Sequence, residues 1–126
     1  MLSFRLLGVA ALAAVSLPLA GPAHAQDAAA GEAVFKKQCY ACHAVIPGKK
    51  GIGPNLFGVV GRPAGSVPDF HYSEANKTSG LTWDPATLDR YIKAPKVVVP
   101  KTTMPYPGLA DDRQRADLIA YLSTLK

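Results

Sequence analysis

Cys39-Tyr40-Ala41-Cys42-His43 is the stretch of this chain that decides its fold, because Cys-x-x-Cys-His is the attachment sequence for a c-type haem. Each thiol adds across one vinyl group of the porphyrin, and the histidine that follows is held beneath the iron as an axial ligand. The pattern therefore predicts that Cys39 and Cys42 anchor one haem covalently and that His43 binds its iron. Such a centre favours electron transfer.

Three other chemistries use paired cysteines. A thioredoxin-like redox motif expects a βαβ pattern around the pair, and this sequence does not supply one. A zinc site needs two further close-set ligands, but beyond residue 25 the chain has only His43 and His71 as histidines and no third cysteine. A structural disulfide stays open for an exported chain, although it gives no role to the histidine that directly follows the second cysteine.

The first 25 residues have the pattern of a secretory signal. Arg5 supplies a short positive region, Leu6 to Ala20 form an apolar run, and Ala23-His24-Ala25 fits the small-x-small cleavage pattern. The run is shorter than the roughly 20 residues that a spanning helix requires, and Pro18 interrupts it. We expect cleavage after residue 25 and a bacterial periplasm as the location, because haem attachment to thiols suits an oxidising compartment.

The remaining segment, residues 26–126, is expected to form one haem-binding domain. A core made only of side chains is marginal at about 100 residues, so a buried macrocycle would be structural as well as functional. The formal net charge of +5 falls to +4 without Arg5, and two ionised propionates bring the holoprotein closer to +2. This mild basicity favours an acidic surface on a protein partner, and the dispersed lysines give no case for nucleic acid.

The hydrophobic pattern predicts a helix at each end of the domain. Residues 28–38 are good helix formers and Asp27 is placed to cap them. Near the other end Asp111 and Asp112 occupy cap or first-turn positions. An apolar stripe at helical spacing follows them: Leu118, Tyr121, Leu122 and Leu125. We expect these two helices to pack on each other.

Between the terminal helices the chain is rich in glycine and proline. One further helix is expected, with Asp84 as its cap, Pro85 at its first position and an end near Lys93. Residues 55–62 and 94–108 are too irregular for regular elements. A long irregular loop in a small domain needs something to fill it, and a haem would do so.

Met104 is the only methionine left once Met1 leaves with the signal. It lies in the segment Pro100-Lys101-Thr102-Thr103-Met104-Pro105-Tyr106-Pro107, whose prolines suit the rigid placement of one ligand atom. A loop methionine that covers apolar surface is the plainer alternative. If the sulfur binds iron opposite His43, the soft ligand raises the reduction potential. Both axial positions are then filled, so the iron passes electrons and does not readily bind oxygen or peroxide.

The chain resembles the class I cytochromes c, most closely the bacterial cytochrome c2 and mitochondrial cytochrome c group. The resemblance covers nearly the whole chain after the leader and is carried by these residues: Gly31, Phe35, Cys39 to His43, Gly53-Pro54-Asn55-Leu56, Gly58 to Arg62, Tyr72 to Lys77, Thr82-Trp83, Tyr91, Pro95, Pro100, Thr102, Met104 and Asp117 to Leu122. It implies an all-α fold in which the N- and C-terminal helices cross through Gly31 against Leu118 and Tyr121. Loops wrap one covalently bound haem c.

The resemblance also implies a second set of contacts around the haem. The Pro54 carbonyl is expected to accept the other N–H of His43 and to fix the orientation of the imidazole. Tyr91 corresponds to a residue whose hydroxyl lies near the ligand methionine, and Thr102 to one that contacts a propionate. The residues expected to hold the other, buried propionate are Arg62, Tyr72, Asn76 and Trp83. Taken alone, these four would be assigned to ordinary packing or to the solvated surface.

A monomeric electron carrier without enzymatic activity is the function that the resemblance implies. Its donor would be a quinol-oxidising cytochrome bc1-type complex, and its acceptor a terminal oxidase or a photosynthetic reaction centre, with only peripheral membrane contact. Two alternatives stay open. One is a peroxidase-like haem enzyme or sensor in which Met104 is labile, and the other is a dedicated electron-transfer subunit of one dehydrogenase.

Some positions depart from the family pattern. The loop between Cys42 and Gly53 is one residue shorter than in mitochondrial proteins and lacks a bracing histidine, and His71 is expected at the surface. The ring of lysines around the exposed haem edge is thinner, and four lysines are candidates for it: Lys49, Lys50, Lys96 and Lys101. We therefore expect apolar docking contacts to contribute more, from Val97, Val98, Val99 and Tyr106.

Overall fold

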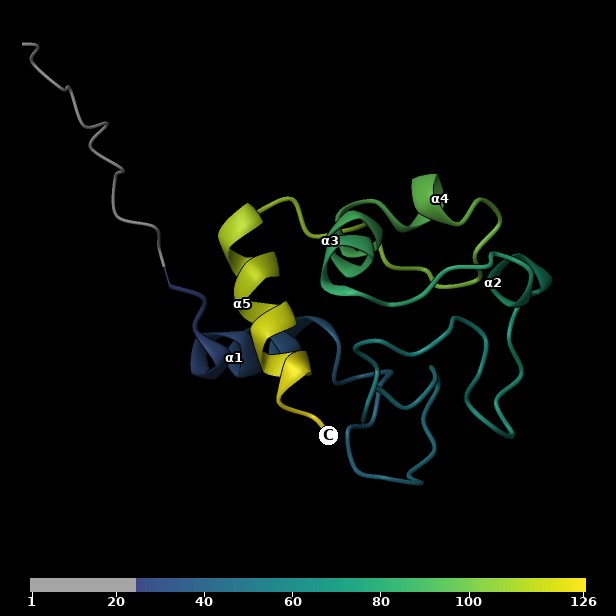
Figure 1. Ribbon diagram of the computed structural model, residues 1–126, viewed down its shortest axis with the longest axis horizontal. Coiled ribbons are helices and arrows are strands. Elements are labelled where there is room, and N and C mark those ends of the chain that lie inside the picture. Colours follow the sequence, from purple (N-terminus) through teal and green to yellow (C-terminus); the bar gives the residue numbers. More distant parts are fainter. Residues whose placement is uncertain (1–24) are drawn as a thin grey trace, which may run out of the picture.

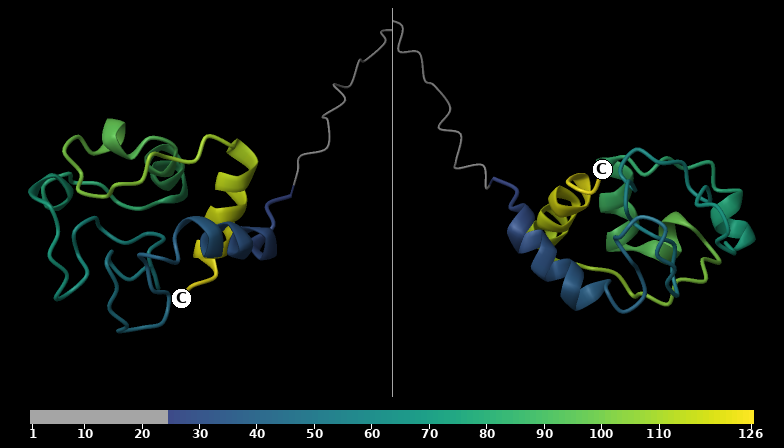
Figure 2. Two further views of the ribbon diagram at one scale, coloured as in Figure 1. Left: turned by 180° about the vertical axis from the view of Figure 1, so that it is seen from behind. Right: turned by 90° about the horizontal axis from the view of Figure 1, so that it is seen from below.

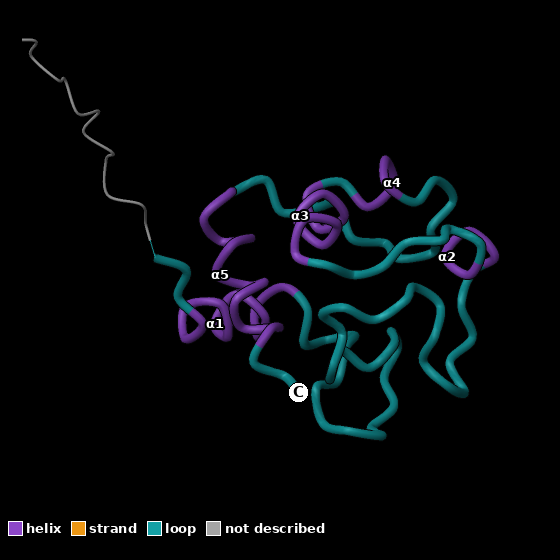
Figure 3. Tube along the Cα trace, in the orientation of Figure 1, coloured by secondary structure: helices purple, strands orange, loops and turns teal. Residues whose placement is uncertain are grey.

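The computed structural model describes residues 25–126, so the expected signal over residues 1–25 lies almost wholly outside the described residues. This part of the chain is built of helices and loops, with one isolated bridge between Pro63 and Thr82 in place of a sheet (Figure 3). The helices are α1 (Ala28–Gln38), α2 (Glu74–Lys77), α3 (Pro85–Lys93), α4 (Pro95–Val98) and α5 (Asp112–Ser123). Among them, none is long and apolar enough to cross a bilayer.

Helix α1 begins where the sequence predicts. The Asp27 carboxylate accepts hydrogen bonds from the backbone N–H groups of Ala29 (2.9 Å) and Ala30 (3.1 Å), which would otherwise lack partners at the helix start. Lys36 and Lys37 in the last turn lie near the negative end of the helix dipole. The helix ends at Gln38, directly before Cys39, and presents the cysteine pair from a fixed position.

Helices α1 and α5 lie against each other at one side of the molecule, and Figure 2 shows the contact from two directions. Gly31 makes the crossing possible, because a Cβ there would collide with the backbone carbonyl of Asp117 and lie 2.9 Å from the Tyr121 Cβ. The expected crossing through Gly31 is confirmed. The nearest atoms belong to Asp117 and Tyr121, whereas Leu118 is buried in the core beside them.

Helices α3 and α5 also follow the sequence pattern. Asp84 caps α3 by accepting from the Thr87 N–H (2.8 Å), and Pro85 is its first residue. Asp111 caps α5 through the Gln114 N–H (2.8 Å). The predicted apolar stripe faces inward, with Leu118 and Leu122 buried and with Tyr121 packed against the core; Leu125, just beyond the end of α5, also packs against it. Figure 1 shows α3 above the crossing, in contact with α5.

The two short helices correct the sequence prediction. Residues 94–108 were expected to be irregular, yet α4 (Pro95–Val98) forms one helical turn inside them, and α2 (Glu74–Lys77) is a second single turn. Each is four residues long, so neither carries the repeated 3.6-residue spacing by which a helix is detected. The prediction for residues 55–62 is confirmed, because they contain no helix or strand.

One hydrophobic core joins the helical side to the loops. Its buried members come from α1, α3, α5 and the connecting segments, and they are Phe35, Val59, Trp83, Leu88, Leu109, Leu118, Ile119 and Leu122. Side chains from both the glycine-rich loop and the terminal helices therefore share one core. The same side chains form much of the wall of the cavity that carries the candidate site.

Candidate functional site

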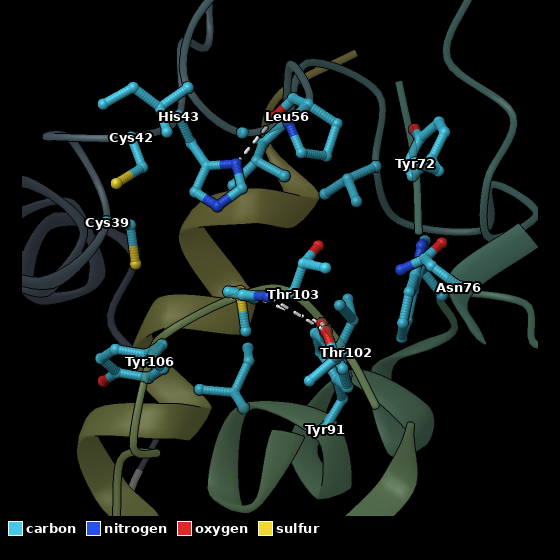
Figure 4. Close-up of a pocket in the computed structure, with 18 of the residues that line it drawn as sticks. Cys39, Cys42, His43, Leu56, Tyr72, Asn76, Tyr91, Thr102, Thr103 and Tyr106 are labelled. Carbon is cyan, nitrogen blue, oxygen red and sulfur yellow. Dashed lines mark hydrogen bonds between the residues drawn. The ribbon is translucent and has the colours of Figure 1, made fainter. Parts of the chain in front are cut away.

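A cavity of about 380 Å³ lies between the helices and the loops. All eleven site residues predicted from the sequence contribute to its wall: Cys39, Cys42, His43, Pro54, Arg62, Tyr72, Asn76, Trp83, Tyr91, Thr102 and Met104. Figure 4 shows His43 and Thr103, the residue before Met104, on opposite walls. The chain thus brings together residues that are up to 65 positions apart in sequence, from Cys39 to Met104.

One wall carries the two thiols and the imidazole. After α1 the chain turns tightly, with the Cys42 N–H (3.1 Å) and the His43 N–H (3.0 Å) both donating to the Cys39 carbonyl. The turn points both sulfurs and the imidazole toward the same space (Figure 4). Both thiols are free, and burial raises the pKa of the Cys39 thiol to about 11. The pair is therefore available for thioether bonds to a group in the cavity.

His43 is held by its backbone surroundings. Its Nδ1 lies 2.8 Å from the Pro54 carbonyl oxygen, an acceptor, so Nδ1 carries the proton and Nε2 keeps its lone pair. Gly53 packs directly on the ring, where a Cβ would lie 2.8 Å from Nδ1 and 2.9 Å from Nε2. Burial lowers the pKa of His43. A neutral imidazole of fixed orientation, with Nε2 free, is what an axial metal ligand requires.

The opposite wall carries Met104. A turn closed by the Thr102 N–H and the Val99 carbonyl (3.0 Å) starts this part of the loop. The Thr102 hydroxyl then accepts from the Met104 N–H at 3.3 Å. The Tyr91 hydroxyl points at the thioether, 3.9 Å from Sδ, and lies 3.5 Å from the Thr102 hydroxyl. Both the backbone N–H and the sulfur of Met104 are thus held, and the sulfur is directed to the cavity.

The polar end of the cavity lies near Tyr72 and Asn76, which Figure 4 shows side by side. The Tyr72 hydroxyl accepts from the Val67 N–H (3.1 Å), which leaves its own proton free to donate. Arg62 donates through its terminal nitrogens to the carbonyls of Phe57 (3.2 Å) and Asn55 (2.9 Å). Its Nε and the Asn76 Oδ1 are buried without a partner within residues 25–126.

These unpaired atoms test whether the cavity fits a haem. Buried polar groups almost always have hydrogen-bond partners, so the guanidinium of Arg62 and the amide of Asn76 indicate a missing polar group. Haem carboxylates would accept from Arg62 Nε, from the Tyr72 hydroxyl and from the Asn76 amide, whose two ends are interchangeable. Apolar side chains line the rest of the wall, among them Leu56, Val59, Leu88, Leu118 and Leu122. The residues therefore fit a flat apolar group with an acidic edge.

Trp83 connects the polar end to the methionine wall. Its ring is 7% exposed and packs against Tyr91 with the ring centroids 4.7 Å apart. Its backbone N–H donates to the Arg62 carbonyl (2.9 Å), so the two backbone segments that carry the indole and the guanidinium are joined. The two residues that the resemblance assigns to one carboxylate are thus linked through the backbone.

Two residues that support the site were not predicted from the sequence. Arg115 on α5 is 2% exposed and donates to the carbonyls of Leu109 and Ala110, both at 2.9 Å, and to Asp89 at 2.9 Å. It also pairs with Asp112. On the other side, the Asn55 side-chain amide donates to two carbonyls of the loop before Gly53. These two hydrogen bonds brace the loop between Cys42 and Gly53.

The surface around the cavity corrects one prediction and agrees with others. Val99 was expected to be a docking contact, but this residue, directly after α4, is only 2% exposed and so is buried in the interior. Val97 is 77% exposed, as a contact residue must be, and Val98 is half-buried. His71 lies at the surface, as expected. The four candidate lysines of the ring are all exposed: Lys49, Lys50, Lys96 and Lys101.

Comparison with known proteins decides the family. Residues 28–126 match the family model described as Cytochrome c. The chain belongs to the cytochrome c family. Cytochrome c2 of Rhodopila globiformis is 48% identical over 106 residues, 84% of this chain and 100% of that protein. Cytochrome c2 of Rhodomicrobium vannielii is 55% identical over 101 residues, 79% of this chain and 80% of that protein.

A solved structure gives the same result for the fold. Cytochrome cH from Methylobacterium extorquens superposes with a TM-score of 0.73 at 48% identity, covering 78% of this chain and 98% of that one. The predicted class I cytochrome c fold is therefore confirmed. The resemblance to class I cytochromes c that the sequence indicated is confirmed as well. Like the rest of its family, this cytochrome c binds one covalent haem c and carries electrons.

Proposed function

We propose that this cytochrome c is exported to the bacterial periplasm, loses residues 1–25, and shuttles single electrons between redox proteins there. The family match begins at residue 28, just after the expected cleavage point. The leader pattern around Arg5 and Ala23-His24-Ala25 supports export. Relatives that carry the name cytochrome c2 match over most of their length, which supports the same class of carrier.

The axial ligands that we propose are His43 Nε2 and Met104 Sδ, with Cys39 and Cys42 as the covalent anchors. The observation that carries this assignment is that the free imidazole nitrogen and the thioether line opposite sides of one cavity. When bound, the haem supplies a metal ion that changes its charge by one electron. The chain's part is to keep the same two ligands in place in both oxidation states, so that little reorganisation accompanies each transfer.

The neighbouring residues hold those ligands in position. The Pro54 carbonyl orients His43 through a hydrogen bond of 2.8 Å. The Tyr91 hydroxyl donates toward the Met104 sulfur at 3.9 Å, which withdraws electron density from the sulfur. The residues that we propose hold the propionates are Arg62, Tyr72, Asn76, Trp83 and Thr102. Pairing and hydrogen bonding are needed there, because a buried carboxylate without them is costly.

The mouth of the cavity indicates how a partner docks. The exposed residues of its lining are Ile52, Thr103 and Pro105, and none of them is charged. Ile52 is 79% exposed. We propose that the partners contact this uncharged rim, while the exposed lysines farther out steer the approach. Weak docking of this kind allows a monomer to alternate between a bc1-type donor and a terminal oxidase or photosynthetic reaction centre.

The proposed carrier function requires that the iron has no open position. Two alternatives, a peroxidase-like enzyme or sensor and a dedicated subunit of one dehydrogenase, make different demands. The first needs Met104 to leave readily, but its loop is tied to Tyr91 on one side and to Arg115 on the other. The second needs a permanent partner, which copurification at fixed stoichiometry would detect.

A spectroscopic redox titration of the holoprotein tests the proposal. The expected result is a single one-electron transition at a positive potential, with a weak near-infrared sulfur-to-iron band in the ferric form. Histidine–methionine ligation accounts for both observations. A high-spin ferric spectrum at neutral pH, or rapid capture of cyanide, would instead support the enzyme or sensor.

A further inference from the structure

The methionine loop, residues 99–110, is anchored to helices α3 and α5. Arg115 donates to the carbonyls of Leu109 and Ala110, and the Leu109 N–H donates to the Ile92 carbonyl at 2.9 Å. Near the other end, Thr102 lies 3.5 Å from the Tyr91 hydroxyl. All of these partners belong to α3, α5 or the loop itself. They hold the loop at Thr102 and at Leu109 and Ala110, and the residues between these positions need another contact to hold them.

The segment that carries Cys39, Cys42 and His43, together with α1 before it, is joined to this loop by one hydrogen bond. The Tyr106 hydroxyl donates to the Gln38 side-chain oxygen at 3.2 Å, across 68 positions of sequence. Within residues 25–126, no other hydrogen bond joins the methionine loop to a residue before 74. Gln38 is the last residue of α1, directly before Cys39, and both partners line the cavity.

The position of Tyr106 in the sequence couples this hydrogen bond to the position of Met104. Pro105 and Pro107 flank the tyrosine, and each fixes its own φ angle near −65°. The backbone between Met104 and Tyr106 is therefore stiff, and an outward movement of the Met104 backbone carries Tyr106 with it. Figure 4 shows Tyr106 on the same side of the cavity as Cys39. A restraint on the Tyr106 hydroxyl is thus also a restraint on the backbone that carries the Met104 thioether.

We propose that the hydrogen bond between Gln38 and Tyr106 is a latch that holds the methionine loop over the cavity and limits exchange of Met104 for external ligands. The proposal rests on the proposed function, in which Met104 occupies one axial position. Gln38 and Tyr106 act as positioning residues, because neither side chain needs to touch the iron. Opening of the latch separates the loop from the haem-attachment segment, while the contact of Thr102 with Tyr91 and those of Leu109 and Ala110 with Arg115 stay in place.

Two substitutions remove the latch while leaving the fold intact. Tyr106→Phe deletes only the hydroxyl, and Gln38→Leu deletes the acceptor at a half-buried position. Gln38→Glu is the conservative rescue, because a carboxylate still accepts from the tyrosine. Tyr121→Phe is the matched control, since the Tyr121 hydroxyl makes no hydrogen bond within residues 25–126 and its ring lies at the crossing of α1 and α5.

The experiment measures binding of imidazole to the ferric holoprotein by visible absorbance, together with hydrogen–deuterium exchange of the loop amides. One hydrogen bond of ordinary strength corresponds to an increase of about 2- to 10-fold in loop opening. We expect this increase in the imidazole association rate and in amide exchange for Tyr106→Phe and for Gln38→Leu. Gln38→Glu and Tyr121→Phe should match the native protein, and the double variant should be no faster than either single variant.

Unchanged imidazole binding and amide exchange in both single variants would overturn the latch, as would additive effects in the double variant. Failure of the proposed ligation gives a different result. In that case the native holoprotein would lack the sulfur-to-iron band and bind imidazole without delay, whereas amide exchange would still report whether Gln38 and Tyr106 hold the loop.

Discussion

Adding a methyl group at Gly31 should force the terminal helices apart. A Cβ at this position collides with the Asp117 carbonyl and lies 2.9 Å from the Tyr121 Cβ, whereas carbon atoms in contact are normally about 3.5–4.0 Å apart. The nearest obstacle is backbone, which cannot rotate away as a side chain could. Helix α5 also supplies Leu118 and Leu122 to the cavity wall, so the displacement reaches the haem site.

The expected loss of stability follows from two opposing terms. Overpacking against backbone, which cannot give way, takes the upper part of the usual overpacking range, about 2–3 kcal/mol, and alanine is favoured over glycine inside a helix by about 1 kcal/mol. Gly31→Ala should therefore lower the free energy of unfolding by about 1–2 kcal/mol, and Gly31→Val by more, because its two further methyl groups meet the same carbonyl. Urea denaturation of the holoprotein, followed by circular dichroism, measures both values.

Ala33→Val is the matched control, because Ala33 is an exposed position of the same helix. It should cost less than about 0.7 kcal/mol, the helix-propensity difference alone. If Gly31→Ala were as stable as the native protein, or more stable, the helices would not approach as closely as the structure shows. The explanation for a glycine at this position would then be wrong.

Three other substitutions test the site and its surroundings. Gly53→Ala should push the His43 imidazole off its hydrogen bond with Pro54, because a Cβ at residue 53 would lie 2.8 Å from Nδ1; the visible spectrum should shift, and an unchanged spectrum would contradict the packing. The hydrogen bond from Arg115 lowers the pKa of Asp112 from 3.8. The stability that the ionised Asp112 carboxylate gives to the folded protein is thus fully present at higher pH and is lost as the pH falls through the lowered pKa. Asp112→Asn should destabilise the protein at about pH 7 but much less at about pH 2 in urea titrations, and equal losses at both would refute the pairing. Ile52→Asp should slow reduction by a membrane-bound quinol-oxidising complex but not by a small inorganic reductant; equal rates with the complex would remove Ile52 from the docking rim.

The local features of the fold were predictable from the sequence. Asp27 and Asp84 are side-chain caps that act within three residues, so the starts of α1 and α3 follow from local chemistry. The single turns α2 and α4 were not detected as helices, because four residues do not repeat a helical period. The length of an element therefore decided whether its pattern was visible.

Long-range features of the site were less accessible. Val99 belongs to an apolar run that gives no sign of which member is buried, and its burial is decided only by the tertiary structure. Arg115 follows a run of polar, exposed residues, 111–114, and its burial depends on Asp89 and on loop carbonyls that the sequence does not place. His43 was recognisable because it belongs to the local motif formed with Cys39 and Cys42. Its hydrogen bond to the Pro54 carbonyl was expected only through the family resemblance.

Ligation of the iron by Met104 is the central claim, and Met104→Ala tests it most directly. The measurement is the near-infrared absorbance of the ferric holoprotein together with its midpoint potential, with Thr103→Ala as the matched control at the neighbouring exposed position. We predict that Met104→Ala abolishes the sulfur-to-iron band and lowers the potential, while Thr103→Ala retains both. A Met104→Ala protein with the native band and the native potential would contradict the account.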